Sequence, residues 1–105
     1  MITATVTKDT NGIYKGFAVK GHALFEDAGK DIVCSAVSIL TINTVNSIEE
    51  FTDSDFDCDS SNVIKLKFNK LPDEKATLLM DSLVLGLKGI SENYSDYLRL
   101  EIKEV

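Results

Sequence analysis

The sequence predicts an α+β fold, a two-layer sandwich in which two helices cover one face of a four-stranded mixed sheet. Four segments alternate apolar and polar residues with the period of a strand, and two longer segments carry apolar residues at helical spacing. The expected element order is β-β-α-β-α-β, with no internal repeat. With 105 residues, 44% of them hydrophobic, and a single proline, the chain is expected to form one domain spanning residues 1–105.

The amino-terminal part is predicted to form a β-hairpin. Residues 1–7 alternate between apolar side chains and threonine, as expected for a strand with one buried face. Asn11 and Gly12 tolerate positive φ, so residues 13–20 are expected to fold back as the second strand. The positions expected to be buried in these two strands are Ile2, Ala4, Val6, Ile13, Phe17 and Val19.

The first helix is expected to follow a mobile loop at residues 21–30, which shows no sustained period. Asp31 is a competent N-cap for a helix that starts at Ile32, because its carboxylate can accept unpaired amide groups of the first turn. The uncharged run at residues 33–48 is shorter than a membrane span and rich in polar residues, so it is interpreted as a core helix. The arc predicted to face the core contains Ile32, Val33, Ala36, Val37, Ile39 and Leu40, and the opposite arc contains Cys34, Ser35, Ser38 and Thr41.

The second half begins with an acidic segment, residues 49–59, which is interpreted as a surface connection. Its alternating acids fit a solvated turn or a charged edge strand better than a calcium loop, since Cys58 and Ile64 replace the required glycine and glutamate. Residues 63–68 alternate as the third strand, a helix is expected from about Asp73, and residues 97–103 alternate as the last strand. The apolar positions of the second helix are Ala76, Leu79, Met80, Leu83, Leu87 and Ile90.

Composition excludes several functional classes. Eleven basic against 17 acidic residues give a net charge of −6, which disfavours direct nucleic-acid binding and suits a basic partner. The start of the chain lacks the features of a signal peptide, and the two cysteines lie far apart, so we expect a cytoplasmic protein with reduced thiols. No cofactor, metal or membrane partner is expected, and a zinc site built on His22 and Cys34 is disfavoured because no cysteine pair lies nearby.

Cysteine chemistry is the most specific activity that the residues suggest. His22 is the only histidine, and Cys34 lies near the expected start of a helix, where the helix dipole and an imidazolium would both lower a thiol pKa. Backbone amides of Cys34 and Ser35 could stabilise an oxyanion. Asp31 could orient His22, or it could be only the helix cap.

Two motifs increase the weight of this hypothesis. They are Gly21-His22-Ala23 and, after Gly29, Asp31-Ile32-Val33-Cys34-Ser35-Ala36-Val37-Ser38. In this order and spacing the chain resembles the ribosomal-processing cysteine protease family (Prp). The resemblance implies that His22 is the general base, Cys34 the nucleophile and Asp31 a motif acid, with Gly21 and Gly29 in a loop that gates access.

The resemblance also implies a substrate and an assembly. Members of the family are bacterial cytosolic homodimers that remove a short amino-terminal extension from a ribosomal large-subunit protein, cleaving after hydrophobic and aromatic residues. Leu78 and Leu85 lie off the main apolar stripe of the second helix and could face a second subunit, or could reach the margin of the core. The alternative function is a non-catalytic, ribosome-associated binding module in which Cys34 only packs.

Overall fold

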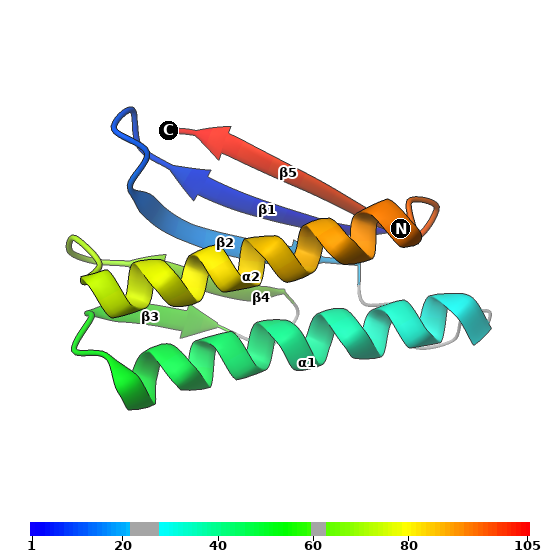
Figure 1. Ribbon diagram of the computed structural model, residues 1–105, viewed down its shortest axis with the longest axis horizontal. Helices are drawn as coiled ribbons and strands as arrows, with labels where there is room; N and C mark the ends of the chain where they lie inside the picture. Colours follow the sequence, from blue (N-terminus) through cyan, green and yellow to red (C-terminus); the bar gives the residue numbers. More distant parts are fainter. Residues whose placement is uncertain (22–27, 60–62) are drawn as a thin grey trace.

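The protein is described by a computed structural model covering residues 1–21, 28–59 and 63–105, with the side chains of residues 28–31 omitted. Both helices pack on the same face of a mixed sheet (Figure 1). The elements are β1 (Ile2–Lys8), β2 (Tyr14–Lys20), α1 (Ala28–Phe51), β3 (Phe56–Asp59), β4 (Ile64–Phe68), α2 (Glu74–Asn93) and β5 (Leu98–Glu104).

The sheet has five strands in the order β3-β4-β2-β1-β5, so the expectation of four strands is wrong. β1 and β5 are parallel and the other neighbours are antiparallel, which confirms a mixed sheet. The additional strand is β3, within the segment expected to be a surface connection. Its register places Asp57 beside Lys67 and Asp59 beside Lys65, so opposite charges on neighbouring strands favour pairing of an otherwise acidic segment. The element order is therefore β-β-α-β-β-α-β.

The first hairpin forms where it was predicted, with one change at its tip. Gly12 adopts a φ of +79°, and the Asp9 carboxylate accepts hydrogen bonds from the amides of Asn11 and Ile13, at 2.8 and 3.0 Å. The pairing shifts between Thr7 and Lys8, so β2 begins at Tyr14. Consequently Tyr14 is buried, and Ile13 is only half-buried, contrary to the prediction.

The buried stripe of α1 is rotated from the predicted arc. Thr41 and Thr44 are buried, whereas Ile32 and Ile39 are 59% and 70% exposed. Burial of the threonines is possible because Thr41 Oγ1 donates to the carbonyl of Val37 at 2.8 Å, and Thr44 makes the same bond one turn later. Each hydroxyl group has its hydrogen-bond partner within the helix, so the threonine can face the core. The prediction placed Thr41 on the arc opposite the core because the residue is polar. The stripe consists of Val33, Val37, Thr41, Thr44 and Ile48.

The start of α1 also differs from the prediction. The helix begins at Ala28, so Asp31 is its fourth residue and not its N-cap. The unpaired amides and the helix dipole stabilise an acidic residue at the N-cap and also in the first turn. An acidic residue near the start of a helix therefore does not distinguish these two positions in the sequence. Gly29 lies in the helix, so the predicted loop at residues 21–30 ends earlier than expected.

By length and composition alone, the Ile32–Phe51 part of α1 could cross a membrane, since it has 20 residues and a mean hydropathy of 1.4. A core helix meets the same criterion. Here one side of the segment packs into the core that it shares with the sheet and α2. The packing supports the interpretation as a core helix.

The second helix follows its prediction closely. Asp73 is the N-cap, and its carboxylate accepts the Ala76 amide hydrogen bond at 2.8 Å. Gly86 lies against α1, where an added Cβ would approach a methyl group of Leu40 to 2.7 Å, so this glycine permits close helix packing. Of the predicted apolar positions, Ala76, Met80, Leu83 and Leu87 are buried, and Leu79 and Ile90 pack against them.

A test of the fold concerns the link between β2 and α2. The Tyr14 hydroxyl donates to Asp81 at 2.5 Å, and burial, this hydrogen bond and the Asp81 charge together raise the pKa of Tyr14 above its ordinary value near 10. The Tyr14→Phe variant should unfold with about 1–3 kcal/mol less free energy at neutral pH. Urea denaturation measures this difference.

The pH dependence has a definite sign. Because the pKa is raised in the folded state, the stabilisation is complete below about pH 10 and is lost as the pH rises further. Tyr14→Phe should therefore lose less stability than the wild type between about pH 9 and pH 11. Tyr94→Phe, at an exposed tyrosine, is the control. Equal alkaline losses in Tyr14→Phe and the wild type would contradict the assignment.

Candidate active site

Cys34 lies in the second turn of α1 as its seventh residue, half-buried and packed against the core cluster. Its position changes two expectations. The amides of Cys34 and Ser35 lie inside the helix, where each is used by a carbonyl four residues earlier, so they are not available as oxyanion donors. The dipole is strongest at the first turn, so it gives Cys34 less help than predicted. Any activation of the Cys34 thiol must therefore come mainly from groups outside the helix backbone.

Gly21 follows the last residue of β2, Lys20, and precedes His22. It has a φ of +91°, and an added Cβ would lie 2.5 Å from the carbonyl oxygen of Met1. Both the dihedral angle and the close approach of the first strand require glycine there. The glycine of the Gly-His-Ala motif thus turns the chain away from the sheet edge directly before the histidine. The carboxyl end of β2 and the start of α1 are joined by residues 22–27.

The remaining predicted site residues are only partly described. His22 lies outside the described residues, and so does the side chain of Asp31, whereas the backbone of Gly29 is part of α1. The proposed pairing of His22 with Cys34 therefore stays a prediction. Ser35 is exposed on α1. Among the residues that the structure describes, no group of three histidine, cysteine or acidic side chains could hold a metal ion.

Cys58 is a thiol on β3 with unfavourable surroundings for nucleophilic chemistry. Partial burial raises the pKa of Cys58, and the negative charges of Asp59 and Glu49 raise it further. Asp59 adjoins Cys58 on β3, and Glu49 acts from α1. The thiolate of Cys58 is therefore scarce near neutral pH.

A hollow of about 170 Å³ lies between α1 and the β3–β4 edge, and the sequence analysis missed it. It could not be expected while residues 56–59 were interpreted as a connection. The alternation of Phe56 and Cys58 with acids was the available signal, because it has the period of a strand. The lining residues are Ile42, Val45, Asn46, Cys58 and Ile64.

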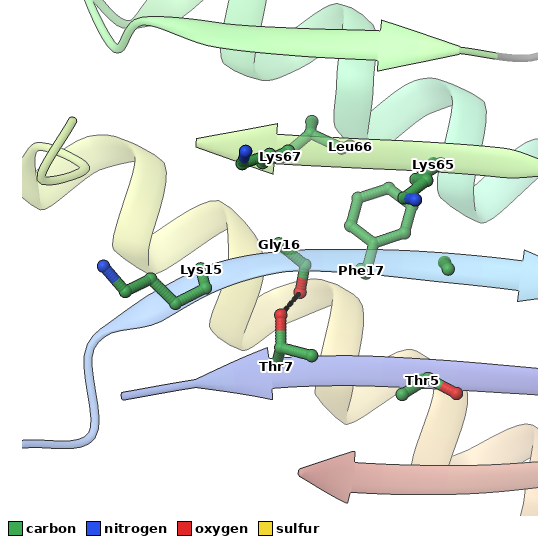
Figure 2. A pocket seen from close by; sticks show the side chains of 9 residues that line it. Thr5, Thr7, Lys15, Gly16, Phe17, Lys65, Leu66 and Lys67 are labelled. Atoms are coloured by element: carbon green, nitrogen blue, oxygen red, sulfur yellow. Dashed lines mark hydrogen bonds between the residues drawn. The ribbon is translucent and has the colours of Figure 1, made fainter. Parts of the chain in front are cut away.

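The opposite, open face of the sheet has a larger hollow of about 260 Å³ over β2 (Figure 2). Its floor consists of small residues such as Gly16 and Ala18, and Lys65 and Lys67 of β4 lie along one side. Thr7 of β1 donates to the Gly16 carbonyl at 3.3 Å. Since α1 packs on the other face, this hollow is separated by the sheet from Cys34.

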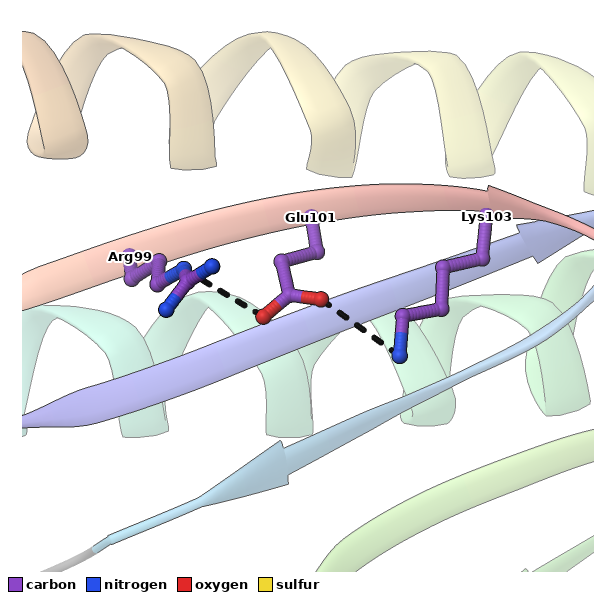
Figure 3. Close-up of polar contacts among 3 residues, drawn as sticks. All are labelled: Arg99, Glu101 and Lys103. Atoms are coloured by element: carbon purple, nitrogen blue, oxygen red, sulfur yellow. Dashed lines mark ion pairs between the residues drawn. The ribbon is translucent and has the colours of Figure 1, made fainter.

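Ion pairs cover another part of the open face. On β5, Glu101 accepts from Arg99 at 3.3 Å and from Lys103 at 3.5 Å (Figure 3). The two basic side chains are 67% and 59% exposed, so the pairs contribute little to stability. We interpret this region as a solvated charged surface.

Comparison with known proteins gives a consistent result. The profile of a family described as cysteine protease Prp matches residues 1–99. A ribosomal processing cysteine protease Prp of Staphylococcus aureus is 28% identical over 107 residues, covering 98% of this chain and 100% of that protein. A crystal structure of an essential ribosomal processing protease Prp from S. aureus with a substrate peptide has a TM-score of 0.91 at 25% identity, covering 98% of this chain and 100% of that one.

A second S. aureus structure of that protease holds a covalently linked product peptide. It has a TM-score of 0.87 at 26% identity and covers the same shares, 98% and 100%. The similarity thus extends over nearly the whole chain, and both solved relatives were captured with peptides.

The contrast between the two cysteines can be measured. At neutral pH, iodoacetamide should modify Cys58 slowly, because its thiolate is disfavoured, and should modify Cys34 at least about tenfold faster if Cys34 is activated. Peptide mass mapping over time gives the two rates. Cys34→Ala and Cys58→Ala serve as single-thiol controls. Equal rates at the two thiols would count against activation of Cys34.

Proposed function

The chain belongs to the cysteine protease Prp family, and on that premise we propose that it is a cysteine endopeptidase acting on a ribosomal large-subunit protein. The reaction is removal of a short amino-terminal extension from that protein. The family match over residues 1–99 is the observation that carries the proposal, because it includes both the Gly21-His22-Ala23 motif and residues 31–38. The S. aureus relative, whose structure was solved with a substrate peptide, supports the proposed peptidase function.

In the proposed mechanism, His22 removes the proton from the Cys34 thiol, and the thiolate sulfur attacks the scissile carbonyl carbon. The carbon–nitrogen bond then breaks, and His22 gives its proton to the leaving amine. Water, deprotonated by His22, hydrolyses the thioester and returns Cys34 to the thiol. The product peptide linked covalently in the S. aureus structure fits a mechanism with an acyl-enzyme stage.

Neighbouring residues have supporting roles in this proposal. Asp31 orients His22 through the second ring nitrogen, a role separate from helix capping, which the start of α1 excludes. The loop that begins at Gly21 gates access to Cys34. Ser35 supports Cys34 through its side chain or its position in α1. Its amide donates a hydrogen bond within the helix and is therefore not the supporting group.

The proposed substrate fits the charge of the chain. A net charge of −6 favours encounter with a basic protein such as a ribosomal one. We place the protein in the cytoplasm, where ribosomal proteins are made and processed.

We also propose that the protein is a homodimer that associates through α2. Leu78 and Leu85 are 68% and 73% exposed, which rules out the reading in which they reach the core margin. Seven residues apart on a helix, they lie on one side and form an uncovered apolar pair.

Cleavage is tested with a synthetic peptide containing the extension and the residues that follow it. Cys34→Ala and His22→Ala should each lower processing by at least about a thousandfold, because nucleophile and base act as a unit. Mass spectrometry should detect the new amino terminus with the wild type only.

Tyr94→Phe, at an exposed tyrosine outside both motifs and outside the hollow beside β3, is the control and should process at the wild-type rate. Circular dichroism and thermal unfolding should show that all three variants remain folded. Processing by Cys34→Ala at the wild-type rate would exclude the mechanism. Binding of the peptide by the wild type without any cleavage would favour the non-catalytic binding module.

Association through α2 is tested with the double variant Leu78→Asp, Leu85→Asp. Burying two unpaired carboxylates in a contact is costly, so this variant should be a monomer at concentrations where the wild type is a dimer. Light scattering after size-exclusion chromatography gives the masses. Leu71→Asp, at a leucine 72% exposed outside α2, is the control. A dimer that survives the double substitution would remove α2 from the interface.

A further inference from the structure

We propose that the hollow between α1 and the β3–β4 edge binds an apolar side chain of the substrate peptide, four or five residues from the scissile bond. The inference rests on the proposed function and adds to it a place where the substrate is recognised away from the reacting atoms. It concerns residues that neither motif contains.

The walls of the hollow suit an apolar group. Ile42 and Val45 come from α1, and Ile64 and Cys58 come from the sheet. Cys58 pairs with buried Leu66, so it lies on the helix-facing side of the sheet, yet it stays exposed because it is on the edge strand. The volume of about 170 Å³ is comparable to the roughly 150 Å³ of an apolar cavity known to accept benzene. A branched or aromatic side chain therefore fits.

The hollow lies on the flank of α1 that carries Cys34. Cys34 and Val45 are eleven residues apart, which is three helical turns plus about 20°, so Val45 lies on the same side of the helix as Cys34, and Ile42 lies about 80° round from Cys34. At 1.5 Å per residue, Ile42 and Val45 lie about 12 and 16 Å along the axis from Cys34. An extended peptide rises about 3.3 Å per residue, so four or five residues span this distance.

Charge at the rim favours a basic peptide as the occupant. Glu49 lies seven residues after Ile42, so the two residues share one side of α1, and the Glu49 charge acts on the Cys58 thiol. Asp59 pairs with Lys65 on the opposite face of the sheet and is not part of the rim. An apolar pocket with an acidic residue beside it is complementary to an apolar side chain next to lysine or arginine.

The test pairs changes in the protein with changes in the peptide. The probe is the synthetic extension peptide, and serine replaces each of its apolar residues in turn. For the wild type, one replacement four or five residues from the scissile bond should lower kcat/KM about tenfold. In Ile42→Ser the same replacement should change kcat/KM less than about twofold, because the pocket has already lost its apolar wall.

Two further variants make the result specific. Cys58→Phe fills the hollow without removing an existing contact and should raise KM with little change in kcat. Ile39→Ser, at an isoleucine 70% exposed on the same helix outside the hollow, should discriminate between the peptides as the wild type does. If Ile42→Ser and Cys58→Phe both show the same kcat/KM difference as the wild type between the unmodified peptide and the critical serine peptide, the inference is overturned.

Binding separates this inference from the proposed function. Fluorescence anisotropy with a labelled peptide and the Cys34→Ala background measures affinity without any turnover. A loss of affinity of about tenfold for the critical serine peptide, abolished by Ile42→Ser, would support the pocket even if no cleavage occurred. Cleavage that depends on Cys34 together with affinities that Ile42→Ser leaves unchanged would retain the protease and reject the pocket.

Discussion

The close approach of β2 and β4 at Gly16 is the constraint on which the rest of the structure depends. An added Cβ at Gly16 would lie 2.1 Å from the carbonyl oxygen of Leu66, so no other residue can occupy this position without a shift of one strand. In the sheet, β2 lies between the β5-β1 side and the β4-β3 side and pairs with a strand of each. Moving it apart from β4 would open the sheet in its middle and uncover the apolar side chains that α1 and α2 share with both halves.

The same strand also fixes the location of the proposed chemistry. β2 ends at Lys20, and the next residue, Gly21, is in close contact with the backbone of Met1. The next described element is α1, and its second turn carries Cys34. Because that turn lies beyond the reach of most of the dipole effect, the nucleophile depends on groups outside the helix backbone. In the proposed mechanism, His22 is the residue assigned to this role.

Strands could be predicted from the sequence wherever the helices fully cover one face of the strand. The alternation in β1 and β4 located both strands correctly, and Asp73 located the start of α2. Two features were not resolved by the sequence pattern. Thr41 is buried because it bonds to its own helix, a contact that hydropathy does not encode. A charged edge strand was one of two alternatives for the acidic segment, and the structure selects it as β3, whose acids lie opposite lysines of β4. The Gly-His-Ala motif was recognised by resemblance, and the reason for its glycine emerged only from the contact with Met1.

The charged outer strands protect the molecule from joining other sheets. β3 is only four residues long and carries Asp57 and Asp59, and β5 on the other edge alternates basic and acidic side chains. An exposed edge with unpaired amides and carbonyls is a template for another chain, and short or highly charged edges discourage such addition. The edges of this sheet therefore discourage extended peptides, or a second copy of the protein, from adding to the sheet as a sixth strand.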